Sequence, residues 1–156
     1  KYAFEYMGAD AMTVMPYMGI ESLEVYFENK DKGIIVGCHS SNPGGKEFQE
    51  LKVQGQPLYH LVAKNLVKAH GSNPNTMIFM GATFPEELVA MRKIVGSMTM
   101  LVPGVGAQGG DVKTFVKAGK NSKGAGLIIN SSRGIILAED PREEAMKLRD
   151  EINKFR

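Results

Sequence analysis

Residues 33–45 read GIIVGCHSSNPGG, a β-branched apolar run that ends in a polar, glycine-rich turn. The run at 33–38 is apolar on both faces, as expected of a strand that is covered on both sides of a parallel sheet. The turn at 40–45 carries Asn-Pro and Gly-Gly pairs, which are typical of chain reversals. We therefore predict a buried strand whose carboxyl end opens into a polar loop.

The rest of the chain repeats this alternation of strand and helix. We predict a single α/β domain over residues 1–156, because five strands alternate with helices and imply a parallel sheet. Two architectures fit this order: a doubly wound sheet, or about five βα units of a (β/α)8 TIM barrel. The predicted strands are 9–14, 33–38, 77–80, 98–102 and 127–130, and the predicted helices are 20–27, 57–69, 85–95, 111–118 and 141–155.

Residues 1–7 have the apolar spacing of a helix that ends at Gly8, but no preceding residue could cap it. We expect the chain to begin inside a helix, as a fragment of a longer protein would.

Composition excludes several classes of protein. Of the 156 residues, 43% are hydrophobic, which is enough for a packed core, and a net charge of +2 gives no basic nucleic-acid footprint. The single cysteine rules out an intrachain disulfide and a Cys-rich zinc site. The longest uncharged run, 94–110, is too short and too rich in glycine to cross a membrane. No signal peptide is visible, so we expect a cytoplasmic protein with no membrane or nucleic-acid partner.

The loop at 102–111, VPGVGAQGGD, is the strongest candidate for a binding site. Its glycines allow the backbone to approach a ligand, and the N–H groups of the following helix favour an anion such as phosphate. Gln108 could reach both a phosphate oxygen and a polar ring atom. The alternative is a flexible connector, because one glycine-rich loop is a weak signal.

Two further loops follow predicted strands. Arg133, in the loop after the last strand, offers a forked cation to a phosphate, although it could simply pair with Glu139 or Asp140. The hydroxyl and amide groups at 40–45 could bind the edge of a polar heterocycle, although the segment could be an ordinary turn.

Other reactive side chains are weaker candidates. His60 and His70 lie on a predicted outer helix and are expected to be solvated, while His39 would at most line the site. Cys38 ends a strand and is expected in the core. The three histidines share no ligand spacing, so we predict no metal site.

The loop at 103–111 is similar to the phosphate loop of the orotidine 5′-monophosphate decarboxylases. Other segments resemble that family in the expected order: residues 10–19 (DAMTVMPYMG), 41–44 (SNPG), 81–83 (GAT) and 132–133. The residue patterns at 13–19 and 41–44 are most similar to those of the longer bacterial and archaeal branch of the family. The resemblance covers essentially the whole chain.

The resemblance implies a TIM barrel in which this chain forms strands four to eight. It further implies decarboxylation of orotidine 5′-monophosphate to uridine 5′-monophosphate, no metal or organic cofactor, and a homodimer when complete. In the family's pattern Ser41 would bond the pyrimidine edge and Pro103 would shape the ring pocket. Gln108 would bridge ring and phosphate, and the phosphate would lie among the residues Gly109, Ser132 and Arg133.

One family motif is missing. The catalytic Asp-x-Lys-x-x-Asp does not occur among the 156 residues, and the family's order would place it upstream of Lys1. No catalytic residue is therefore assigned in this chain, and we expect the chain alone to be inactive.

Two other functions remain open. One is a different phosphate-binding barrel enzyme, such as a hexulose-phosphate synthase or a ribulose-phosphate epimerase. The other is a non-catalytic barrel fragment that binds a nucleotide or phosphate.

Overall fold

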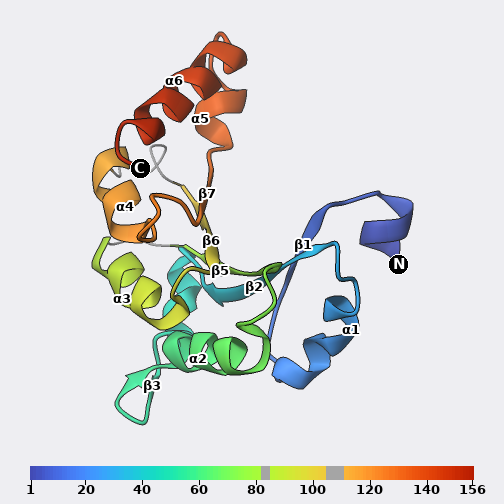
Figure 1. The fold of residues 1–156 in the computed structure, drawn as a ribbon. Coiled ribbons are helices and arrows are strands. Elements are labelled where there is room, and N and C mark those ends of the chain that lie inside the picture. The colour runs from blue at the N-terminus through green and yellow to red at the C-terminus, as the bar shows by residue number, and fades with distance from the viewer. Residues whose placement is uncertain (82–84, 105–110) are drawn as a thin grey trace.

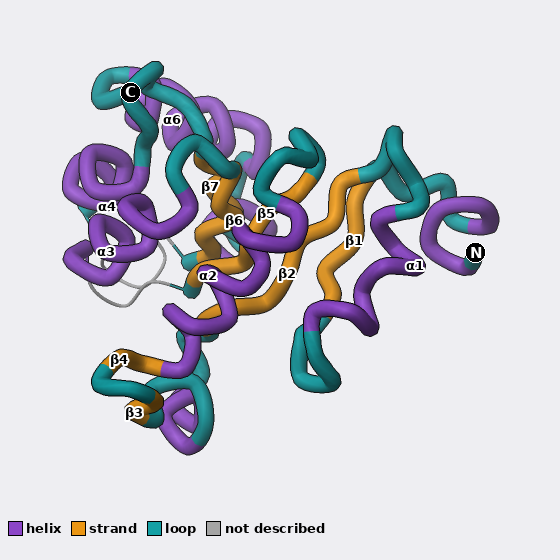
Figure 2. Tube along the Cα trace, turned by 60° about the horizontal axis from the view of Figure 1, so that its bottom comes forward, coloured by secondary structure: helices purple, strands orange, loops and turns teal. Residues whose placement is uncertain are grey.

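A computed structural model describes residues 1–81, 85–104 and 111–156. Within these residues, five strands form one fully parallel sheet whose order follows the chain (Figures 1 and 2): β1 (Ala11–Val14), β2 (Gly33–His39), β5 (Thr76–Met80), β6 (Thr99–Pro103) and β7 (Leu127–Asn130). A doubly wound sheet reverses its strand order at a switch point. The observed order instead matches consecutive strands of a barrel.

The main helices follow one another along one side of this sheet, and each contacts the next in chain order. They are α2 (Leu58–His70), α3 (Pro85–Val95), α4 (Val112–Gly119) and α6 (Pro141–Asn153). Shorter helical segments lie in the connections: η1 (Tyr2–Tyr6), η2 (Ile20–Leu23), α1 (Glu24–Phe27), η3 (Pro43–Glu47) and α5 (Arg133–Ile136). This arrangement is expected because every parallel connection turns with the same right-handed sense.

The two faces of the sheet differ in burial. Successive side chains of a strand point to opposite faces, and the set that faces the helices is almost completely inaccessible: Ile34, Val36, Ile78, Met80, Met100 and Val102. On the other face Met77, Phe79 and Leu101 are half-buried, while Ile128 is 43% exposed. The core therefore lies between sheet and helices.

Most predicted elements are confirmed. The helix predicted at 85–95 and the strand predicted at 127–130 coincide with α3 and β7. The predictions missed α5 and a small antiparallel hairpin of β3 (Lys52–Val53) and β4 (Gln56–Pro57). Strands of two residues and a helix of four are too short to show a hydrophobic period.

One expectation about the histidines is wrong. His70 is buried: its ring stacks on Phe27 with 3.8 Å between centroids, and its Nε2 lies 3.2 Å from Oε1 of Glu24. The ring thus fills the junction between α1 and the end of α2. His60 is half-buried, with its ring edge-on to Tyr59.

Arg92 ties three βα units together at the amino-terminal end of the sheet. Its guanidinium donates to four backbone carbonyls: Nε to Gly119 at 2.8 Å, Nη1 to Gly96 at 2.8 Å and to Met98 at 2.6 Å, and Nη2 to Gly126 at 2.8 Å. Burial lowers the pKa of this guanidinium, and the hydrogen bonds offset the cost of desolvating it.

In the part that the structure describes, no helix is long and apolar enough to cross a membrane.

Replacing Arg92 should destabilise the fold. We expect Arg92→Met to lower the free energy of unfolding by about 2–4 kcal/mol, because several charge-assisted hydrogen bonds are lost and carbonyls are left unpaired. Arg92→Lys should recover only part of this loss, since an ammonium group lacks the planar fork. Urea denaturation measures both. Arg142→Met, at an exposed position of α6, is the matched control and should change stability by less than about 0.5 kcal/mol. Equal stability of Arg92→Met and the unsubstituted chain would contradict this role.

Candidate functional site

A cavity of about 330 Å³ lies where the strands of the main sheet end at their carboxyl side. All strands of this sheet contribute to it directly or through the residue that follows. Its lining consists of Thr13, Met15, Gly37, Cys38, His39, Ser40, Gln49, Phe79, Leu101, Pro103 and Asn130. Apolar walls with a few convergent polar groups are typical of small-molecule sites, and the carboxyl end of a parallel sheet is where such ligands bind.

The turn after β2 forms one wall of this cavity. Ser40 lines it and Ser41 follows as an exposed residue. The Gly81 N–H donates to the His39 carbonyl at 2.7 Å, which holds the end of β5 against this turn. A Cβ at position 81 would lie 2.5 Å from the Ser41 backbone nitrogen, so only glycine permits this approach.

The opposite wall comes from β6 and β7. Pro103, predicted to shape a ring pocket, is the last residue of β6 and pairs with Asn130 at the end of β7. Both side chains line the cavity. The structure thus brings Pro103 to the same cavity as the residue that precedes Ser41.

His39, at the end of β2, is the most buried polar side chain that lines the cavity, with 3% exposure. Its Nε2 lies 3.4 Å from Oε1 of Glu50, its Nδ1 lies 3.9 Å from Oε2 of Glu87, and its ring stacks on Tyr59 at 4.5 Å. Burial, with Glu87 and Glu50 adding to it, raises the pKa of Tyr59. His39 lines the candidate cavity, and two carboxylates and a phenol lie beside it.

The phosphate-side residues are placed only in part. Gln108 and Gly109 lie outside the described residues. Ser132 is the N-cap residue of α5, and its carbonyl accepts from the N–H groups of Ile135 and Ile136. Arg133 is the exposed first residue of α5. Neither Ser132 nor Arg133 lines the cavity, so both stand beyond its β7 wall.

Neither of the alternative partners, Glu139 and Asp140, forms an ion pair with Arg133 in the described part of the chain. Asp140 caps α6, accepting from the N–H groups of Arg142 and Glu143 at 2.9 Å each. Among the ion pairs between described residues, none involves Arg133. Its guanidinium is therefore available to a ligand.

The amino end of α4 differs from the prediction of an open anion site. The Asp111 carboxylate accepts from the N–H groups of Lys113 and Thr114, each at 3.2 Å. The hydroxyl of Thr114 donates to the same carboxylate and, with these N–H groups, lowers the pKa of Asp111. Two of the helix's free donors are thus used by its own capping residue.

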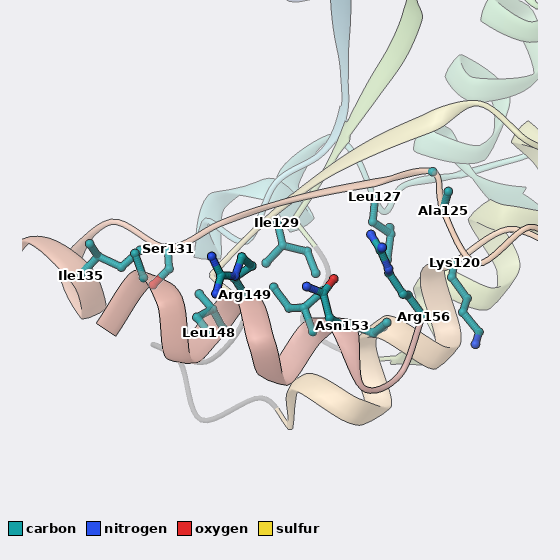
Figure 3. A pocket seen from close by; sticks show the side chains of 15 residues that line it. Lys120, Ala125, Leu127, Ile129, Ser131, Ile135, Leu148, Arg149, Asn153 and Arg156 are labelled. Carbon is teal, nitrogen blue, oxygen red and sulfur yellow. The ribbon is translucent and has the colours of Figure 1, made fainter. Parts of the chain in front are cut away.

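A second cavity, of about 400 Å³, lies between β7 and α6 (Figure 3). Apolar side chains such as Leu127, Ile129 and Leu148 form much of its lining. Two cations at its rim already have partners, because Lys120 donates to the Phe155 carbonyl and Arg149 pairs with the neighbouring Asp150. The cavity at the strand ends is lined by residues of every strand of the sheet and gathers the polar side chains of Thr13, His39, Ser40, Gln49 and Asn130, so it is the better candidate site.

Sequence reasoning missed Asn130, Thr13 and Gln49 as lining residues. Asn130 is the polar residue that ends an apolar strand, and this position could have indicated that it lines the site. No signal marked Gln49, which lies beyond the predicted turn. Within residues 1–81, 85–104 and 111–156, no three His, Cys, Asp or Glu side chains gather closely enough to hold a metal ion.

Cys38 lies in the core, as predicted, with 5% exposure. Burial raises the pKa of its thiol to about 12. The thiol is therefore uncharged at neutral pH and is not a nucleophile, since the thiolate is the reactive form.

This environment predicts resistance of Cys38 to alkylation. At pH 8 about one thiol in ten thousand would be ionised with a pKa of about 12, against about a quarter for an ordinary cysteine. We expect iodoacetamide to modify the native chain at least a hundredfold more slowly than a free thiol, as followed by mass spectrometry. The same chain in guanidinium chloride should react fully. A native rate within tenfold of the free thiol would contradict the buried placement.

Comparison with known proteins gives a consistent result. Residues 1–148 match the profile described as "Orotidine 5'-phosphate decarboxylase / HUMPS family". The chain is 46% identical over 160 residues to an orotidine 5'-phosphate decarboxylase of Janthinobacterium sp. (strain Marseille), with 98% of this chain and 59% of the relative covered. It is 45% identical over 163 residues to one of Ralstonia pickettii (strain 12J), with 100% and 60% covered.

Solved structures are similar along nearly the whole chain. The OMP decarboxylase of Leishmania donovani superimposes with a TM-score of 0.91 at 37% identity, covering 99% of this chain and 60% of that one. The UMP synthase of the same organism gives 0.93 at 40% identity, covering 99% and 35%. The chain thus spans about three fifths of the length of the curated relatives it matches.

Proposed function

The chain belongs to the orotidine 5'-phosphate decarboxylase / HUMPS family, and we propose that it serves the conversion of orotidine 5′-monophosphate to uridine 5′-monophosphate and CO₂. This reaction is the last step of de novo pyrimidine synthesis. The proposal gives these 156 residues the task of binding the pyrimidine and the phosphate.

The cavity at the strand ends carries this proposal. It is lined by the serine turn after β2 and by Pro103 and Asn130, which lie at the carboxyl ends of β6 and β7. A planar heterocycle between these walls would meet hydroxyl and amide groups at its edge and apolar groups on its faces. Such a combination suits a nucleotide base better than a sugar phosphate alone.

Each residue then has a separate role in binding. Ser41 bonds the pyrimidine edge and Pro103 shapes the ring pocket. Gln108 bridges the ring and the phosphate, and the phosphate lies near Gly109 and Ser132. The exposed guanidinium of Arg133 binds the phosphate through charge-assisted hydrogen bonds.

The chemistry needs no large group to move. The bond between the ring and the carboxylate breaks, CO₂ leaves, and the electron pair remains on the ring carbon until it forms a bond to a proton, which takes the place of the lost CO₂. Binding energy from the remote phosphate can be used to hold the ring where this charge is stabilised. In the family's pattern the proton comes from the lysine of the Asp-x-Lys-x-x-Asp motif, which the 156 residues do not contain.

Binding of uridine 5′-monophosphate tests the proposal most directly. We expect the chain to bind this nucleotide in isothermal titration calorimetry, and Arg133→Ala to weaken the affinity about 10- to 100-fold, because a charged partner of the phosphate is lost. Arg142→Ala, also at an exposed position in the first turn of a helix, should bind like the unsubstituted chain. Equal losses in the two variants would show that Arg133 acts only through overall charge.

Decarboxylation tests the missing motif. We expect the pure chain to release no CO₂ from carboxyl-labelled orotidine 5′-monophosphate, because no proton donor of the family's type is present. The full-length relative from Ralstonia pickettii serves as the positive control. Measurable turnover by the chain alone would contradict this expectation.

The choice of ligand separates this function from the alternatives. A barrel of the hexulose-phosphate synthase or ribulose-phosphate epimerase type would prefer ribulose 5-phosphate, whereas the serine turn at the cavity favours a base. Tighter binding of uridine 5′-monophosphate supports our proposal, and the reverse order supports the alternative. Nucleotide binding without any activity of the complete protein would instead identify a non-catalytic module.

The proposal includes a cytoplasmic location and a homodimer for the complete protein, with no nucleic-acid or membrane partner. Membership of the family supports the location and the dimer, and the small net charge of +2 supports the lack of a nucleic-acid partner. Sedimentation of the complete protein tests the dimer.

A further inference from the structure

One side chain closes the turn that carries Ser41. Oε1 of Gln49 accepts a hydrogen bond from the Ser40 backbone N–H at 2.8 Å and lies 3.3 Å from the Ser40 hydroxyl, which donates to it. The two residues are nine positions apart. The carboxamide of Gln49 therefore takes the place that a neighbouring strand would take at the end of β2, since it satisfies the N–H of the residue that follows that strand.

The backbone of Gln49 is fixed on both sides. Its N–H donates to the Gly45 carbonyl at 2.8 Å, and its own carbonyl accepts from the N–H of Tyr59, in the first turn of α2, at 3.0 Å. The segment 45–49 is thereby tied to a long helix. The backbone that carries the carboxamide is thus held by two hydrogen bonds besides those of its side chain, one to the end of the turn and one to α2.

The turn has little room to shift against this frame. A Cβ at Gly45 would lie 3.0 Å from Oε1 of Gln49 and 3.2 Å from the Ser40 hydroxyl. On the other side, Gly81 approaches the Ser41 nitrogen as described above. The peptide between Ser40 and Ser41 is thus packed between two glycines. The peptide before it donates its N–H, that of Ser40, to the Gln49 side chain.

We propose that Gln49 is a positioning residue that orients Ser41 toward the pyrimidine and so determines the preference for a base over a bare sugar phosphate. This inference rests on the proposed function. Gln49 also lines the cavity, but its Oε1 is engaged by Ser40, so its main effect on the ligand is exerted through the turn. Loss of this acceptor should weaken base recognition and leave phosphate recognition intact.

Two variants separate the hydrogen bond from the bulk of the side chain. Gln49→Met has nearly the same length and no strong acceptor, whereas Gln49→Glu keeps an acceptor oxygen for Ser40. Calorimetry on the full 156-residue chain would measure affinity for uridine 5′-monophosphate and for ribose 5-phosphate. We expect Gln49→Met to bind the nucleotide about tenfold more weakly, with ribose 5-phosphate binding unchanged within twofold. Gln49→Glu should remain within threefold of the unsubstituted chain for both ligands.

Amide hydrogen exchange gives a readout without any ligand. The Ser40 N–H should exchange at least tenfold faster in Gln49→Met than in the unsubstituted chain or in Gln49→Glu, as followed by nuclear magnetic resonance. An unchanged exchange rate, or equal losses of affinity for both ligands, would overturn the positioning role. If the unsubstituted chain does not bind uridine 5′-monophosphate, the proposed function fails and the role in base recognition fails with it. The exchange rates would still report whether Gln49 holds the turn.

Discussion

Parallel pairing between consecutive strands is the constraint on which the rest of this molecule depends. Two parallel neighbours cannot be joined by a tight turn, so each pair requires a crossover, and these crossovers share one handedness. Strands in chain order therefore place the helices on one side and all carboxyl ends at one edge. The candidate site follows from this geometry, because turns that are far apart in the sequence meet only at that edge.

The two ends of the sheet carry different kinds of interaction. At the amino-terminal end, the partners of Arg92 among the described residues are all backbone carbonyls, so this part of the link contains no carboxylate that acid could neutralise. At the carboxyl end, His39 lies between Glu50 and Glu87 and against Tyr59. The end of the sheet with the candidate cavity thus carries a histidine beside two carboxylates, whereas the opposite end carries a guanidinium bonded to backbone carbonyls.

Anion binding in this fold depends on which donors remain unused. The N-terminus of α4 would suit a phosphate, but Asp111 already occupies two of its N–H groups. Asp140 does the same at α6. Arg133 has no ion-pair partner among the described residues, so it is the side chain on which the proposed phosphate affinity relies. A helix N-terminus is an anion site only when its own cap leaves donors free.

The sequence by itself determined the elements and their polarity: β-branched runs became strands, apolar periods became helices such as α3 (Pro85–Val95), and Cys38 was correctly placed in the core. Hydrophobic periodicity left a doubly wound order and a barrel order open; the resemblance implied the barrel order, and the strand order confirms it. Only the tertiary structure buried His70 and brought Gln49 to Ser40. The physical reason is the separation along the chain of the residues that interact. Periodicity reports on neighbours within a turn or two of chain, whereas Arg92 meets carbonyls 27 and 34 residues away, and such contacts depend on how whole crossovers pack.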